Sequence, residues 1–93
     1  MKLKGTEFQI LVWKEIAKIP YGQTRSYKEL AIAIGKPNSS RAVANACGKN
    51  PYAPEIPCHR VIRSDGHIGG YSGSGGKKRK KQLLEQEGLI FKY

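Results

Sequence analysis

The amino-acid sequence predicts a mainly helical fold: a winged-helix-like helix-turn-helix domain with a small β hairpin. Four segments carry helix-capping signals or apolar residues at helical spacing, and one short β-prone segment leads into an Asp-Gly turn. A length of 93 residues corresponds to one domain, which we expect to span residues 1–93. The hydrophobic content of 39% is enough for a globular core and argues against a disordered chain.

The first predicted helix begins after Thr6, because Thr6 and Gln9 have the T-x-x-Q spacing of a capping box. Apolar residues then recur at helical spacing as far as Ile19. Pro20 and Gly22 follow and end the helical pattern, so we expect a turn or a short extended piece after them.

Two shorter helices are predicted next. Ser26 and Glu29 form a second capping box, and Asn38 or Ser39 is positioned to cap the third helix, which ends at Gly48. Two short helices joined by about four or five residues have the length pattern of a helix-turn-helix. The same pattern also occurs in ordinary pairs of antiparallel helices.

Alanines alternate along the third predicted helix at Ala42, Ala44 and Ala46. Small side chains allow a helix to approach a neighbouring surface closely. Tight packing inside the domain is the commoner reason for such a composition, and close approach to a DNA backbone is the alternative.

The second half of the chain begins with a proline-rich connector, NPYAPEIP, and continues with HRVIRSDGHIG, which predicts the β hairpin. A glycine-rich stretch then leads into a last helix, KKRKKQLLEQEG. Its first turns hold five consecutive basic residues, 77–81, where a helix dipole favours negative charge. We expect a solvated basic face there, with contact to phosphates as the alternative.

Charge is the strongest global signal in the composition. Seventeen Lys and Arg residues against seven Asp and Glu give a formal net charge of +10. Such a basic domain favours a polyanion, namely nucleic acid or an anionic membrane surface, although basic charge can also serve solubility alone. Because the chain has neither a span-length apolar run nor a signal-peptide pattern, we expect a cytoplasmic protein with no membrane partner. We also expect a monomer.

The stretch IPCHRVI places Cys58 beside His59 and allows three interpretations of the cysteine. A structural thiol is the ordinary expectation for an isolated cysteine. A metal site is disfavoured because Cys47 and Cys58 lack CxxC spacing, so we expect no metal. A nucleophilic Cys58 needs a base and a group that orients it, for which His59 and Glu87 are the candidates. Residue types alone leave these alternatives open.

Five stretches, YGQTRSYKELA, SSRAVANACGKNP, IPCHRVI, GGYSG and LLEQEG, together resemble the ordered motifs of the O6-alkylguanine-DNA alkyltransferases. In that family they form a helix-turn-helix segment, the recognition helix with its asparagine hinge, the active-site signature, a substrate-pocket loop and the closing helix. The likeness runs from about Thr6 to Gly88 and is to the family's C-terminal catalytic and DNA-binding domain. Each motif is unspecific alone, and their common order makes the resemblance specific.

The resemblance implies catalytic roles for five residues. Cys58 would be the nucleophile and alkyl acceptor, with His59 as its base through a water and Glu87 holding the imidazole in the right tautomer. Tyr27 would donate to N3 of the departing guanine, and Asn50 would tie the recognition helix to the turn that bears the cysteine.

The resemblance also implies how the substrate is held. Arg41 would enter the base stack where the flipped nucleotide left, and the backbone around Val61 would read the exocyclic amine of the base. Tyr71 and Ser72 match the loop that packs against the base. The recognition helix, with Ala42 and Ala44, would lie in the minor groove of double-stranded DNA.

The implied function is direct-reversal DNA repair: a single transfer of an alkyl group from guanine O6 to Cys58, without a cofactor. The chain departs from the common pattern in lacking the N-terminal domain that most members carry, and in being two residues longer between Tyr71 and the closing helix. One alternative is an alkyltransferase-like protein, in which tryptophan usually replaces the cysteine. Another is a non-enzymatic winged-helix DNA-binding protein with a structural Cys58.

Overall fold

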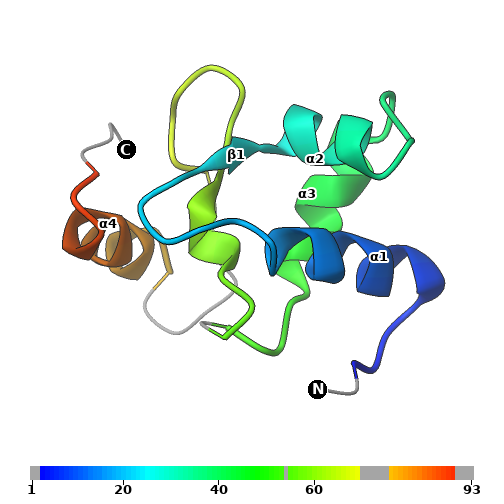
Figure 1. Ribbon diagram of the computed structural model, residues 1–93, viewed down its shortest axis with the longest axis horizontal. Coiled ribbons are helices and arrows are strands. Elements are labelled where there is room, and N and C mark those ends of the chain that lie inside the picture. Colours follow the sequence, from blue (N-terminus) through cyan, green and yellow to red (C-terminus); the bar gives the residue numbers. More distant parts are fainter. Residues whose placement is uncertain (1–2, 54, 70–75, 90–93) are drawn as a thin grey trace.

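The computed structural model describes residues 3–53, 55–69 and 76–89 (Figure 1). Within these residues the chain is mainly helical with a small pair of strands, so the predicted fold class is confirmed. The elements in chain order are α1 (Glu7–Ile16), β1 (Arg25–Ser26), α2 (Tyr27–Ala33), α3 (Ser40–Gly48), the 3-10 helix η1 (Cys58–Arg60), β2 (Val61–Ile62) and α4 (Gly76–Gln86).

Both predicted capping boxes form. The Thr6 hydroxyl accepts the Gln9 backbone N–H at 3.1 Å, and the Gln9 side chain accepts the Thr6 N–H at 3.0 Å. Ser26 and Glu29 make the same reciprocal pair at the start of α2. Because each box satisfies two backbone groups that have no partner inside the helix, these two sequence signals fix where α1 and α2 begin.

The third helix begins as predicted but without the expected side-chain cap. Ser39 occupies the capping position of α3, and its side chain makes no capping hydrogen bond. Its φ of −108° and ψ of 22° lie outside the extended region that side-chain capping normally uses. Packing of α3 against α1 and α2 therefore stabilises this helix without a side-chain cap.

The expected β hairpin is the part of the fold prediction that is wrong. β2 pairs with β1 in parallel, with Arg25 opposite Val61 and Ser26 opposite Ile62. A parallel pair brings together segments that are far apart in the chain, so no local turn signal predicts it.

The Asp-Gly turn after β2 does form, but it does not lead into a return strand. The Arg63 N–H donates to the His67 carbonyl at 2.9 Å, and Gly66 has a φ of 89°. Ile68 then turns into the core, and Gly69 has a φ of 72°, in the left-handed region. The chain thus leaves the extended conformation that a second hairpin strand needs.

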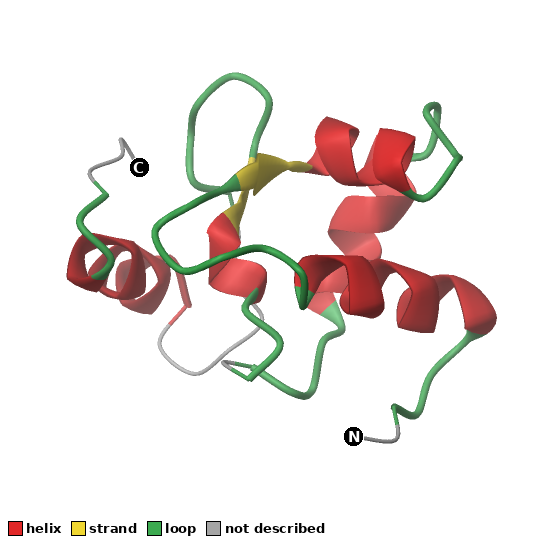
Figure 2. Ribbon diagram, in the orientation of Figure 1, coloured by secondary structure: helices red, strands yellow, loops and turns green. Residues whose placement is uncertain are grey.

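The core lies where α1, α2 and α3 meet, with η1 packed against α1 (Figures 1 and 2). Trp13 is its largest buried residue; its Nε1–H donates to the Ala46 carbonyl at 2.8 Å, and its ring meets Tyr52 edge-on. The indole bond joins α1 to α3 and satisfies the one polar group of the ring. This core supports η1, the element that carries Cys58.

The basic run at the start of α4 is only partly solvated. Lys77, Lys78 and Arg79 are exposed, whereas Lys80 is fully buried and donates from Nζ to the Val61 carbonyl. The expectation of a solvated face is therefore wrong for Lys80. It lies one helical turn before the buried Leu84, so the helical period places both on the face that packs inward. Across the described ranges, no helix has both the length and the apolar character to cross a bilayer.

Candidate active site

Cys58 opens η1 and is buried, with 3% of its surface exposed. The preceding residues set its position. Cys58 N–H donates to the Ile56 carbonyl at 2.8 Å, and the Arg60 N–H donates to the Pro57 carbonyl at 2.9 Å. Cys58 and Cys47 are both thiols, and burial raises the pKa of Cys47 to about 12. Cys47 is therefore a protonated and unreactive thiol at neutral pH.

His59 and Glu87 meet as the resemblance implies. His59 Nε2 lies 2.7 Å from Glu87 Oε2, and both side chains are almost fully buried. Burial lowers the pKa of His59 below its ordinary value, against the opposing effect of Glu87. The imidazole is therefore neutral at pH 7, with its Nε2–H donated to the carboxylate. In this tautomer Nδ1 carries the lone pair and is the basic nitrogen.

Glu87 is held by two separate segments, the turn at Gly22 and the helix η1. Its Oε1 accepts the Gly22 N–H at 2.7 Å and the Arg60 Nε–H at 3.0 Å, while Oε2 faces His59. Burial acts to raise the pKa of Glu87, but these hydrogen bonds outweigh it and leave the pKa below its ordinary value. An ionised Glu87 can therefore fix the histidine tautomer across the neutral pH range.

Arg60 is a site residue that the sequence prediction missed. Besides Glu87, it donates from Nη1 to the Ile19 carbonyl at 2.9 Å, and its guanidinium lies over the Tyr21 ring. It therefore ties η1 to the segment after α1 and balances the charge of Glu87. Its place directly after Cys58 and His59 was the only available signal.

Lys80 is the second residue that was missed, because it was assigned to a solvated basic run. Its Nζ lies 6.0 Å from the centre of the Tyr27 ring. Burial lowers the pKa of Lys80 to about 8, although Cys58 and Cys47 act to raise it. Lys80 thus brings a buried positive charge into the region of Tyr27 and Cys58.

Tyr27 begins α2 and is half-buried. Burial is the main reason that its pKa is raised to about 12, and the neighbouring thiols Cys47 and Cys58 raise it further. At neutral pH it is therefore a phenol that can donate a hydrogen bond. Gly69 is packed against it, because a Cβ on Gly69 would lie 3.0 Å from the Tyr27 hydroxyl.

Asn50 is buried and joins the end of α3 to the connector before Cys58. Its Nδ2 donates to the Ile56 carbonyl at 3.0 Å, and its Oδ1 accepts the Tyr52 N–H at 2.9 Å. Both ends of the amide are thus satisfied by the backbone of the connector. This geometry agrees with the predicted hinge position, and the catalytic role stays a prediction.

The residues expected to hold substrate lie in different environments. Arg41 and Tyr27 line one cleft of about 610 Å³, together with Ala44. Ala42 is exposed on α3 outside that cleft, and Val61 is fully buried in β2. The predicted loop residues Tyr71 and Ser72 lie outside the described residues.

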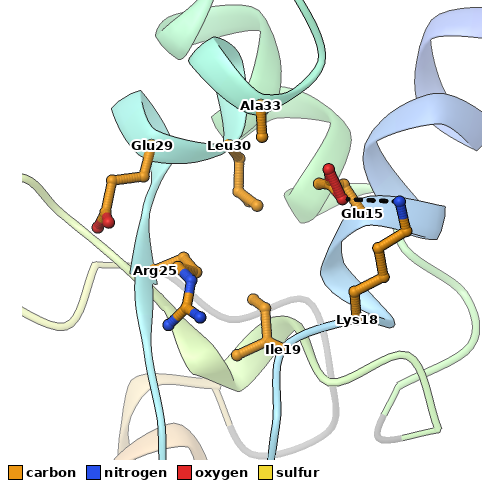
Figure 3. Close-up of a pocket in the computed structure, with 7 residues that line it drawn as sticks. All are labelled: Glu15, Lys18, Ile19, Arg25, Glu29, Leu30 and Ala33. Carbon is orange, nitrogen blue, oxygen red and sulfur yellow. Dashed lines mark ion pairs between the residues drawn. The ribbon is translucent and has the colours of Figure 1, made fainter.

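A separate cavity of about 310 Å³ lies between α1 and α2 (Figure 3). Its rim is charged, and Lys18 and Glu15 pair across 3.3 Å at its edge. None of the predicted site residues lines it, so we do not assign the chemistry to this cavity. In the part of the chain that the structure describes, no three His, Cys, Asp or Glu side chains are grouped to hold a metal ion.

The fold and the site can now be compared with known proteins. A family model described as "6-O-methylguanine DNA methyltransferase, DNA binding domain" matches residues 7–89, almost the whole chain. The chain belongs to this family. The matching segment includes both Cys58 and Glu87, so the buried thiol and its proposed partners fall inside the family's DNA-binding domain.

Relatives in the family are longer than this chain. The methylated-DNA–protein-cysteine methyltransferase of Mycobacterium tuberculosis is 53% identical over 87 residues, which are 94% of this chain and 52% of that protein. The Escherichia coli bifunctional transcriptional activator/DNA repair enzyme Ada is 52% identical over 94% of this chain and 24% of its own length. The chain thus spans about half the length of such methyltransferases and about a quarter of the Ada proteins.

Two solved structures extend the comparison to DNA complexes. The M. tuberculosis OGT in complex with DNA has a TM-score of 0.87 and 53% identity, covering 92% of this chain and 52% of that one. S. pombe Atl1, in complex with damaged DNA containing O6-carboxymethylguanine, has a TM-score of 0.80 and 36% identity, covering 94% of this chain and 81% of that one. Two proteins of this fold, 53% and 36% identical to this chain, therefore bind DNA in solved structures.

Proposed function

We propose that residues 1–93 form one domain that binds double-stranded DNA and transfers an alkyl group from O6 of guanine to Sγ of Cys58. One observation carries the proposal: the buried thiol at the start of η1 is followed directly by a histidine held 2.7 Å from an ionised, fully hydrogen-bonded carboxylate. A nucleophile next to an oriented base is the arrangement that thiol activation requires.

The proposed reaction needs no cofactor. The Cys58 thiol gives its proton, through a water, to Nδ1 of His59, while Glu87 stabilises the imidazolium that forms. The thiolate attacks the alkyl carbon, a C–S bond forms, and the bond from that carbon to O6 breaks. The electron pair passes to the guanine ring, where the Tyr27 hydroxyl donates a hydrogen bond to N3. Because the resulting thioether is not hydrolysed, each chain acts once.

On the DNA side, α3 is proposed to lie in the minor groove. Val43, Ala46 and Cys47 pack into the core, and Ala42 and Ala44 flank this buried face of the helix on its two sides, Ala42 exposed and Ala44 half-buried. Ala46 thus packs inside the domain, and Ala42 and Ala44 are proposed to approach the DNA closely. A guanine must leave the duplex before a buried thiol can reach its O6, and Arg41 is proposed to fill the gap.

Mass spectrometry tests the transfer directly. Incubating the protein with a duplex containing O6-methylguanine should add one methyl group to the peptide of Cys58 and none to that of Cys47. Cys58→Ser should abolish the adduct and leave DNA binding largely intact, because a hydroxyl is a poorer nucleophile than a thiolate. An adduct on Cys47 that persists in Cys58→Ser would contradict the proposal.

A second function is favoured by one observation, the similarity to S. pombe Atl1 over 81% of that chain. An alkyltransferase-like protein would bind the lesion without removing the alkyl group. Tight binding to the O6-methylguanine duplex with no adduct on Cys58 would establish that function instead. Cys58 itself argues for transfer, since this class usually carries tryptophan at that position.

A further inference from the structure

The cleft beside α3 is lined by a second arginine that the proposed mechanism does not use. The start of α3 contributes Ser40 and Arg41 to the lining, and the start of α2 contributes Tyr27. The turn after β2 contributes Arg63, Ser64 and Asp65. Two arginines from different elements therefore line one open cleft of about 610 Å³.

Arg63 is held in place by its own turn. Its Nη2 donates to Asp65 Oδ2 at 2.5 Å, and Asp65 Oδ1 accepts the His67 N–H at 3.1 Å. The backbone bond from Arg63 N–H to the His67 carbonyl closes the same turn. The contact with Asp65 engages one of five N–H groups, so the planar guanidinium can take a second acceptor in a fixed direction.

Arg63 also lies beside the phenol that is assigned to the guanine. A Cβ on Gly69 would be 3.0 Å from the Tyr27 hydroxyl and 3.4 Å from Cγ of Arg63, so both side chains converge on this glycine. The Tyr27 hydroxyl and the side chain of Arg63 therefore lie close to one another.

Stability of the turn is a weak reason for this arrangement. The side chains of Arg63 and Asp65 are 57% and 44% exposed, and exposed ion pairs contribute little to folding. Asp65 also lines the cleft and offsets part of the charge of Arg63, so its part in this arrangement is to orient the guanidinium. A phosphodiester fits this space, because guanidinium groups bind its oxygens through charge-assisted, directional hydrogen bonds.

We infer that Arg63, oriented by Asp65, binds a backbone phosphate next to the flipped nucleotide, in the cleft that it lines together with Arg41. The inference rests on the proposed function for the identity of the flipped base. Arg41 fills the space that the base leaves, and Arg63 holds the displaced nucleotide by its phosphate. During nucleotide flipping, Arg41 thus acts on the duplex and Arg63 on the flipped nucleotide.

Equilibrium binding to a duplex containing O6-methylguanine tests this role. Arg63→Ala should weaken binding roughly fivefold at 0.15 M salt and reduce the slope of log K against log salt by about 1. Arg63→Lys, which keeps the charge, should recover the slope. Lys14→Ala is the matched control, because Lys14 is exposed on α1, does not line the cleft, and removes the same charge. Thermal unfolding of each variant checks that the turn still folds.

Single phosphates can then be neutralised one at a time as methylphosphonates around the lesion. Wild type should lose affinity at several positions. Arg63→Ala should lose nothing further at one phosphate adjacent to the lesion and should keep the losses at the others. If Arg63→Ala behaves like Lys14→Ala, or loses affinity equally at every modified position, the inference is overturned.

These measurements report binding, not transfer. If Cys58 takes up no alkyl group, the proposed reaction fails while the phosphate scan still shows whether Arg63 contacts the DNA. If transfer occurs but no phosphate responds to Arg63, only the present inference fails.

Discussion

At the scale of single residues, the environment of Glu87 shows how a buried carboxylate can stay ionised beside a histidine. The carboxylate accepts hydrogen bonds from Gly22 and Arg60 as well as facing His59, so it remains ionised in a buried place. A buried charge is tolerated when it is paired and hydrogen-bonded. The orientation of the imidazole thus depends on residues from three parts of the chain.

Replacing Glu87 with Gln should slow alkyl transfer by about 100-fold or more, because the charge that stabilises the imidazolium is lost. Single-turnover rates would measure this, with Glu85→Gln on the exposed part of α4 as the control. A rate equal to that of wild type would show that Glu87 is structural.

Glu87→Gln should also change how the free energy of unfolding depends on pH under acidic conditions. The pKa of Glu87 in the folded protein lies below its ordinary value, so its contacts stabilise the fold above the unfolded pKa. That stability is lost as the pH falls through the folded pKa. Denaturant unfolding should therefore show a smaller loss on acidification for Glu87→Gln than for Glu85→Gln.

Lys80 should make stability depend on pH on the alkaline side. Its pKa is about 8 in the folded protein and 10.5 for an ordinary exposed lysine, so the unfolded chain binds the proton more tightly between these values. The cost of burying the charge is present below pH 8 and is relieved as the pH rises towards 10.5. Relative to Lys80→Met, wild type should gain up to about 3 kcal/mol over this interval.

The difference between the two proteins is the quantity to measure, by denaturant unfolding at each pH. Burial raises the pKa of Cys47 and Tyr27, so both act in the opposite direction to Lys80. Because Lys80 acts to lower the pKa of Cys47, the difference between wild type and Lys80→Met also includes this coupling. Lys78→Met, at an exposed position of α4, is the control. A pH-independent difference between wild type and Lys80→Met would contradict the burial of a titrating Lys80.

At the scale of elements, helix starts were predictable wherever a local signal fixes them. Thr6 and Ser26 begin α1 and α2 through reciprocal hydrogen bonds within three residues of sequence. The basic run of α4 shows the limit of such reasoning, because charge suggested exposure while the helical period buried Lys80. When the two signals conflict, the period decides which face packs inward.

Element α3 carries the prediction for Arg41. The first turn of this helix lines the cleft, so an arginine there can enter a base stack. Arg41→Ala should slow transfer from duplex DNA at least tenfold, because extruding a base costs a few kcal/mol. Transfer from free O6-benzylguanine, which needs no extrusion, should fall far less.

Single-turnover rates at saturating duplex and at matched free base would decide this point. Lys49→Ala, which removes one charge near the other end of α3, is the control. A loss of affinity with an unchanged rate at saturation would make Arg41 an ordinary phosphate contact. Equal loss on both substrates would place the defect in the base pocket.

At the scale of the whole molecule, local sequence patterns could not predict the contacts between segments that are far apart in the chain. The parallel contact joins residues 25–26 to 61–62, and the burial of Lys80 against Val61 joins α4 to β2. Residue types named His59 and Glu87 as candidates, and the ordered family motifs predicted that the two meet. Arg60 lies in the same motif as His59, but its contacts with Glu87 and the Ile19 carbonyl emerged only from the fold.

The sequence separation between His59 and Glu87 also matters during synthesis of the protein. Glu87 follows His59 by 28 residues, so a ribosome makes the thiol and the imidazole well before the group that orients them. A nascent chain that has not yet reached Glu87 holds Cys58 as an ordinary cysteine. The reactivity of Cys58 should therefore arise only after most of the domain has been synthesised and folded. An incomplete chain lacks the activated thiol and is protected in this way from premature alkylation.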